Sequence, residues 1–220
     1  MTATPDISSL AAHEIDVIFD GVAALSGVSA SFSPGTITAV SGGNGSGKST
    51  LLGVLAGTIA PQSGRVSRLP EKAMPALVVQ RSAASDTLPL TVSEVVNMGR
   101  WADRGMWRRL SADDRETAQS CMRAMGILPL ADRPLGALSG GQRQRALVAQ
   151  GLARRADVLL LDEATAGVDA EALELIMTAL RAEAARGAIV VHATHEESVL
   201  AEADHVLRLD RGTVLTLPVD

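Results

Sequence analysis

A glycine-rich segment between two apolar stretches limits the folds open to this chain. It runs Gly42-Gly43-Asn44-Gly45-Ser46-Gly47-Lys48-Ser49, a glycine followed by four residues and then Gly-Lys-Ser. Thr36–Val40 before it predicts a strand, and Thr50–Ala56 after it is apolar at helical spacing and predicts a helix. In that setting the glycines let backbone N–H groups curl around phosphates at the N-terminus of the helix. The segment, called the phosphate loop below, therefore predicts nucleotide binding.

Two side chains of the phosphate loop have predicted roles of their own. Lys48 is expected to bridge the β- and γ-phosphates, and the Ser49 hydroxyl is expected to bind Mg²⁺. The alternative is a glycine-rich turn that happens to hold a lysine. The strand before the loop and the helix after it favour the nucleotide site.

A second run places two acids at the end of an apolar strand. Leu159-Leu160-Leu161 is followed by Asp162 and Glu163, and an unbroken apolar run of this length is typical of a buried parallel strand. Asp162 can hold Mg²⁺ beside a phosphate loop, and Glu163 can polarise the attacking water. The alternative is a pair of acids that solvate a strand end.

Composition excludes several classes of protein. With a net charge of −5, the 220-residue chain lacks the basic surface that nucleic-acid binding needs. Its one cysteine, Cys121, cannot form an internal disulfide, which favours the reduced cytosol. The chain shows neither an apolar run of about 18 residues nor an export signal. We therefore expect a soluble cytoplasmic protein that reaches a membrane only by docking to another subunit.

Strands alternate with helices along most of the chain, which predicts a parallel α/β sheet. Between about residues 82 and 152 the pattern is mostly helical, and Ser111 with Asp114 predicts a capping box. The expected strands are Glu14–Phe19, Val28–Phe32, Thr36–Val40, Ala76–Val79, Asp157–Asp162, Ala188–Ala193, Val206–Leu209 and Val214–Leu217, the last two as a hairpin. The expected helices are Thr50–Ala56, Val92–Gly99, Ser111–Met125, Gly140–Ala153 and Ala170–Ala185.

A third motif connects the first two to a known family. Leu138-Ser139-Gly140-Gly141-Gln142 resembles the signature sequence of ABC ATPases, and it precedes the Asp162 strand as in that family. Ser139 and the glycines would open a helix whose free N–H groups can face a γ-phosphate. In isolation a simple serine-capped helix start would be the favoured interpretation of the motif. Its position between the phosphate loop and the Asp162 strand makes the resemblance specific.

The resemblance covers essentially the whole chain and implies further roles. Gln80 resembles the glutamine that senses Mg²⁺ and the γ-phosphate, and His195 resembles the switch histidine. Ala166-Gly167-Val168-Asp169 resembles the loop that communicates across the dimer. Phe19 stands where an aromatic ring stacks on adenine, although a core Phe is the alternative. The residues implied to contact ATP are Phe19, Gly42, Gly43, Asn44, Gly45, Ser46, Gly47, Lys48, Ser49, Thr50, Ser139, Gly140, Gly141, Gln142 and Asp169. Lys48, Gln80, Glu163 and His195 are implied to be catalytic, and Ser49, Gln80 and Asp162 to bind Mg²⁺.

Three positions depart from the family pattern. Gly43 and Ala164 stand where proline is common, and Glu196 follows the histidine where aspartate is frequent. None of these changes removes a reacting group. Ala164 puts the tightness of communication across the dimer in doubt.

The resemblance implies a single domain, 1–220, with an ATPase core, an N-terminal antiparallel β-subdomain and an inserted helical subdomain at about 82–152. Two copies should enclose two ATP molecules, each between the phosphate loop of one chain and Ser139-Gly140-Gly141 of the other. Integral membrane permease subunits, and indirectly a substrate-binding protein, would be the partners. The chain would lie on the inner face of the cell membrane.

The cargo is expected from a weaker resemblance. Leu88–Val92 and Val96–Trp101, with a later Trp107, are most similar to importers of zinc and manganese. We expect zinc, with manganese, iron-siderophore, haem or cobalamin import as alternatives. The two tryptophans would form a docking surface or an ordinary core. A soluble non-transport ABC ATPase, an exporter ATPase and a non-catalytic cassette are the competing classes. His192 and His195 lie three apart on a predicted strand, so we do not expect them to bind metal together.

Overall fold

The computed structural model describes residues 9–69, 74–79, 90–104 and 109–215. The strands are β1 Ser9–Phe19, β2 Val22–Phe32, β3 Ile37–Ser41, β4 Ser63–Leu69, β5 Ala76–Val78, β6 Val158–Asp162, β7 Ile189–Ala193, β8 His205–Asp210 and β9 Thr213–Val214. The α-helices are α1 Lys48–Ala56, α2 Val92–Arg104, α3 Ala112–Ala124, α4 Gly140–Ala153, α5 Ala170–Ala185 and α6 Glu197–Glu202. Two short 3₁₀ helices, Leu128–Leu130 and Leu135–Ala137, lie between α3 and α4.

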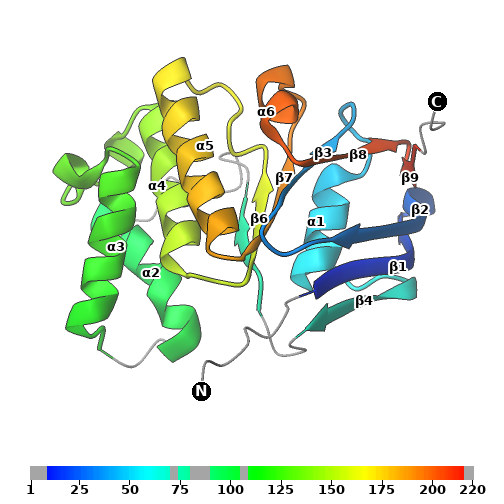
Figure 1. Ribbon diagram of the computed structural model, residues 1–220, viewed down its shortest axis with the longest axis horizontal. Helices are drawn as coiled ribbons and strands as arrows, with labels where there is room; N and C mark the ends of the chain where they lie inside the picture. Colours follow the sequence, from blue (N-terminus) through cyan, green and yellow to red (C-terminus); the bar gives the residue numbers. More distant parts are fainter. Residues whose placement is uncertain (1–8, 70–73, 80–89, 105–108, 216–220) are drawn as a thin grey trace.

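Two sheets organise the described part of the chain (Figure 1). One has the order β5-β6-β7-β3-β8-β9, and its first five strands run parallel. The other is antiparallel, with the order β2-β1-β4. Together with the helices, the two sheets confirm the expected α/β fold with an antiparallel β-subdomain.

The apolar run of β6 is continuous because both faces of the parallel sheet are covered. Leu159 and Leu161 belong to a core shared with α2, α3, α4 and α5. Val158 and Leu160 belong to a second core, shared with α1 and the antiparallel sheet. Helix α1 therefore lies between the two sheets, and the phosphate loop that starts it is held from both sides.

Most of the expected elements are confirmed. Helices Gly140–Ala153 and Ala170–Ala185 have the expected bounds, whereas α1 begins at Lys48, two residues earlier than expected. Strand β4 was not expected from the sequence, because only Val66 among its central residues is apolar and most of them are exposed. Its pairing with β1 makes Ser63–Leu69 a strand. The expected C-terminal hairpin forms, but its second strand is only Thr213–Val214.

Helices α2, α3 and α4 pack together at one end of the molecule (Figure 1). The expected capping box is present, because Ser111 and Asp114 each accept a hydrogen bond from the other's backbone N–H. Arg100 Nε donates to Asp114 Oδ1 at 3.1 Å, and Asp114 is only 2% exposed. This ion pair connects α2 to the start of α3.

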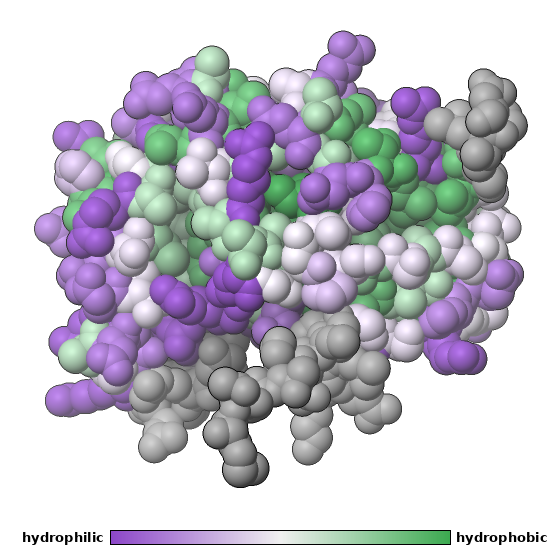
Figure 2. Space-filling view, viewed as in Figure 1, coloured by the Kyte–Doolittle hydropathy of each residue, from purple (hydrophilic) through white to green (hydrophobic). Residues whose placement is uncertain are grey.

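On the face seen in Figure 2, the surface differs between the two ends of the molecule. Figure 2 shows hydrophilic side chains over the helical end and a more apolar area toward β8 and β9. Among the described residues, no helix has both the length and the apolar character needed to cross a membrane.

His192 lies in the middle of the parallel sheet and is completely buried. Neither ring nitrogen has a hydrogen-bond partner among the described residues. Burial lowers the pKa of this imidazole to about 4, from an ordinary value of 6.5. The folded chain therefore holds His192 neutral at a pH where the unfolded chain protonates it.

We predict that the free energy of unfolding falls as the pH drops from 6.5 to about 4. The unfolded state binds the extra proton in that window, so the contribution is about 1.4 kcal/mol per pH unit, on the order of 3 kcal/mol in all. Urea unfolding at several pH values measures it. His192→Leu should remove this part of the slope, whereas changing exposed His205 to Gln should not. Equal slopes in wild type and His192→Leu would contradict the prediction.

Candidate active site

The phosphate loop leaves the carboxyl end of β3 and enters α1 with glycines at its tightest points. Gly42 has φ 155° and Gly47 has φ 102°, conformations that L side chains rarely adopt. A Cβ on Gly42 would lie 2.3 Å from the Leu209 carbonyl oxygen, and one on Gly47 would lie 2.6 Å from that of Ala24. Gly43 has open space around it, so no close contact requires glycine where the family often has proline.

Lys48 is the first residue of α1 and is 5% exposed. Its ammonium group donates to the carbonyl oxygens of Gly42 at 2.8 Å and Gly43 at 3.0 Å. These bonds fold the side chain back over the loop, where backbone N–H groups and the positive end of the helix dipole also gather. The loop is therefore built to hold an anion.

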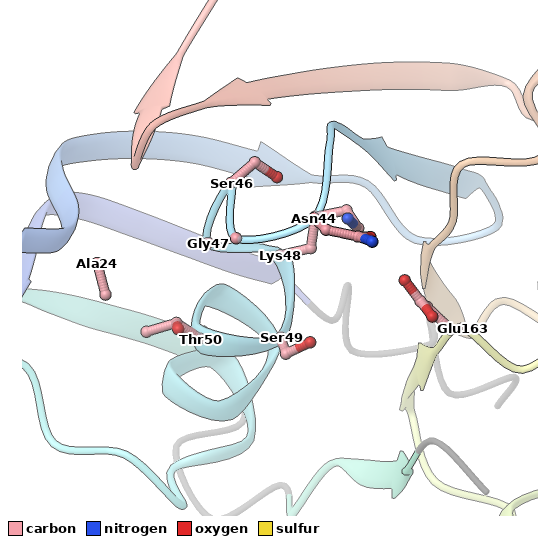
Figure 3. Close-up of a pocket in the computed structure, with 9 residues that line it drawn as sticks. Ala24, Asn44, Ser46, Gly47, Lys48, Ser49, Thr50 and Glu163 are labelled. Atoms are coloured by element: carbon pink, nitrogen blue, oxygen red, sulfur yellow. The ribbon is translucent and has the colours of Figure 1, made fainter. Parts of the chain in front are cut away.

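The loop borders a pocket of about 510 Å³ lined by Ala24, residues 44–50 and Glu163. Figure 3 shows Lys48 and Ser49 extending from the loop and from the start of α1 toward the side on which Glu163 lies. Thr50, one of the residues expected to contact ATP, lines the same pocket. The pocket therefore brings the phosphate loop together with Glu163, which comes from a distant part of the sequence.

Asp162, Glu163 and His195 meet at the edge of the sheet where β3 ends. β7 pairs with β3 on one side and with β6 on the other, so the residues after these strands come together. His195 Nδ1 lies 3.7 Å from Glu163 Oε1. The His195 side chain is 58% exposed and that of Glu163 is 17% exposed.

Glu163 has an unusual backbone. Its φ is 49°, in the left-handed region that non-glycine residues seldom occupy. Its N–H donates to the Ala193 carbonyl oxygen at 2.9 Å, which holds the turn against β7. Ala164, the next residue, is fully buried in the core. Strained residues of this kind collect at functional sites, where surrounding structure fixes them.

Asp162 fits a site for a divalent cation. Oδ1 is buried and has no hydrogen-bond partner among the described residues. Burial raises the pKa of this carboxyl, and the nearby Ser49 hydroxyl opposes the shift. A partly buried carboxylate beside a hydroxyl supplies the oxygen ligands that Mg²⁺ prefers.

The signature motif forms a helix start apart from this pocket. Ser139 caps α4, and its side chain and that of Gln142 form a capping box. A Cβ on Gly141 would meet nothing within 4 Å. None of these residues lines the pocket of the same chain, and Ser139 is exposed.

The other expected site residues are less central in the described structure. Phe19 ends β1 and is 49% exposed, so it is not a core residue. Asp169 caps α5 by accepting from the N–H of Ala172 at 2.8 Å. Trp101 in α2 is partly buried, and Gln80 and Trp107 lie outside the described residues.

Some residues at the site were not found from the sequence. Ala24 lines the pocket from β2, and the Leu209 and Gly212 backbones lie against the loop region from the end of β8 and the turn after it. No motif marks them, because they contribute backbone atoms or a methyl group. The described residues contain no cluster of three or more His, Cys, Asp or Glu side chains that could hold a metal ion.

Comparison with known proteins identifies the family of this chain. The family model described as ABC transporter matches residues 25–166. A Chlamydia pneumoniae protein named a probable metal transport system ATP-binding protein is 35% identical over 94% of this chain and 83% of its own length. The manganese transport system ATP-binding protein MntA of Synechocystis is 34% identical over 90% of this chain and 82% of its own length.

A solved structure has the same fold. The ADP conformation of MJ1267, an ATP-binding cassette of an ABC transporter, superposes with a TM-score of 0.80 at 25% identity, covering 96% of this chain and 90% of that one. The chain belongs to the ABC transporter family, as an ATP-hydrolysing cassette.

Proposed function

We propose that this chain is the ATP-hydrolysing subunit of an importer that takes up a metal ion through a separate membrane permease. The observation that carries the catalytic part is the meeting of Lys48, Glu163 and His195 at one sheet edge, with His195 and Glu163 3.7 Å apart. The relatives named for metal and manganese transport support the cargo class. The protein would lie on the cytoplasmic face of the membrane, with residues 1–220 as one domain divided at about 82 and 152.

The residues have complementary roles in the proposed reaction, ATP plus water giving ADP and phosphate. Backbone N–H groups of the phosphate loop and the Lys48 ammonium hold the β- and γ-phosphates. The Glu163 carboxylate accepts a hydrogen bond from the attacking water and orients it toward the γ-phosphorus. His195 lies beside that carboxylate, where it can contact the γ-phosphate. When bound by Ser49, Asp162 and Gln80, Mg²⁺ would supply positive charge that stabilises the phosphate oxygens.

The second half of the site is proposed to come from a second copy. Ser139, Gly140 and Gly141 start α4 away from their own chain's pocket, and their N–H groups are suited to a γ-phosphate. A dimer would place this terminus over the phosphate loop of the partner. Phe19, half exposed at the end of β1, is suited to stack on adenine.

Zinc is the proposed cargo, and manganese is the second candidate because a relative carries that name. Iron-siderophore, haem and cobalamin are further alternatives. The chain need not bind the cargo itself: the permease and a substrate-binding protein would do so, with the surface around Trp101 facing the permease. A soluble non-transport ABC ATPase is the alternative of another class.

Removing the Lys48 ammonium should weaken nucleotide binding. Charged hydrogen bonds contribute about 1.5–3 kcal/mol each, so Lys48→Ala should lower the affinity for ATP by roughly tenfold to a hundredfold or more. Titration with a fluorescent ATP analogue measures this. Arg123→Ala, which removes an exposed cation on α3, is the control and should bind normally. Unchanged affinity in Lys48→Ala would exclude the assigned role.

Glu163→Gln should retain ATP binding but lose hydrolysis, because the amide keeps the shape of the side chain and removes the water-orienting charge. We expect turnover to fall by roughly a hundredfold or more. Phosphate release measures turnover, and light scattering with ATP measures the closed dimer, which this variant should accumulate. Glu171→Gln, an exposed acid at the start of α5, is the control. Rapid hydrolysis by Glu163→Gln would show that another group orients the water.

Cargo can be tested in cells that lack the gene. Radioactive zinc uptake should be lost, and wild type should restore it while Glu163→Gln should not. If zinc uptake is normal and manganese uptake is lost in the same cells, the cargo is manganese. Normal uptake of both ions would direct the test to iron-siderophore, haem and cobalamin, and normal uptake of all of them would favour a non-transport ATPase.

A further inference from the structure

The turn between β8 and β9 contacts the phosphate loop, although it lies near the other end of the chain. The Gly212 N–H donates to the Ser46 carbonyl oxygen at 3.0 Å. The Gly212 carbonyl oxygen accepts from the Ser26 N–H at 2.8 Å. One residue of the turn is therefore bonded both to the phosphate loop and to β2.

Gly212 and Gly47 both approach the Ala24 carbonyl oxygen without a side chain of their own. Gly212 has φ 80°, and a Cβ there would lie 2.7 Å from the Ala24 carbonyl oxygen. A Cβ on Gly47 would lie 2.6 Å from the same oxygen and 3.6 Å from Gly212 Cα. The end of β8 adds a further contact, since a Cβ on Gly42 would lie 2.3 Å from the Leu209 carbonyl oxygen. The loop is thus packed against backbone near both of its ends.

The bond from Gly212 also determines how one peptide group of the loop is oriented. The carbonyl of Ser46 and the N–H of Gly47 belong to the same planar trans peptide, so they point in opposite directions. Holding the Ser46 carbonyl toward the turn aims the Gly47 N–H away from it. Gly47 lines the pocket. Figure 3 shows Ser46 on the side of the loop nearest β8, which is drawn in pale red.

We propose that Gly212 is a positioning residue for nucleotide binding, which fixes the Ser46–Gly47 peptide so that its N–H faces the phosphates. This inference rests on the proposed nucleotide site at the phosphate loop. According to this proposal, changing the β8–β9 turn weakens ATP binding by more than a loss of folding stability alone would. A turn that merely docks the C-terminal hairpin would affect stability alone.

Two glycine variants separate these effects. Gly212→Ala introduces the close contact with the Ala24 carbonyl, whereas Gly187→Ala places the same strain, at φ 98°, in the turn between α5 and β7 with nothing within 4 Å. Both variants should lower the melting temperature. Only Gly212→Ala should raise the Kd and the KM for ATP, by about tenfold, while kcat at saturating ATP stays within about threefold of wild type. Equal ATP affinity in the two variants would overturn the inference.

A second experiment uses the wild-type chain, so it does not require that the Gly212→Ala variant folds. Coupling between two sites is reciprocal, so ATP should slow hydrogen exchange of the Gly212 amide together with the amides of residues 45–49. Protection of the loop without any change at Gly212 would overturn the inference. A wild-type chain that bound no ATP would overturn both the proposed function and this inference, whereas normal binding by folded Gly212→Ala overturns the inference alone.

Discussion

Strand β7 pairs in parallel with β3 on one side and with β6 on the other, and the whole site depends on this arrangement. The phosphate loop follows β3, the two acids follow β6, and His195 follows β7 between them. Parallel strands place their carboxyl ends at one edge, so residues from three distant segments face one another. Two backbone hydrogen bonds extend this pairing beyond the ends of the strands. The Glu163 N–H donates to the Ala193 carbonyl oxygen, and the Thr194 N–H donates to the Val40 carbonyl oxygen.

The same arrangement has a cost in the core. A strand in the middle of a doubly covered sheet has no access to water, and His192 lies there without a hydrogen-bond partner among the described residues. Burial lowers the pKa of this imidazole to about 4 and favours its neutral form, which contributes to the loss of stability in acid. Three residues later, His195 is largely exposed beside Glu163, so the same residue type occupies two opposite environments at the end of one strand.

The phosphate loop packs against the backbones of β2, the end of β8 and the β8–β9 turn. Its glycines are needed where β2 and the end of β8 approach too closely for a Cβ. The support extends to Gly212, which links the loop to the C-terminal hairpin. The signature helix α4, in contrast, begins away from its own chain's pocket, which is the geometry expected if a second copy completes the site.

The motifs of the candidate site could be recognised in the sequence, because the proposed chemistry requires particular residue types at fixed spacing. Lys48, Asp162 and Glu163 belong to this class, and the capping box at Ser111 and the bounds of α4 and α5 follow equally from local rules. The alternation of strands and helices along the chain also predicted the parallel sheet. The motifs, the capping box and the helix bounds depend on interactions within a few residues along the chain.

Other features were decided only by the tertiary structure. The side chains of Ser63–Leu69 are mostly polar and exposed, so they do not by themselves predict a strand. This segment is a strand because it pairs with β1. Ala24, Leu209 and Gly212 support the loop through a methyl group or backbone atoms, which leave no motif in a sequence. Contacts between backbones depend on how distant elements pack. In the sequence they are visible only as a glycine at a position where a side chain would not fit.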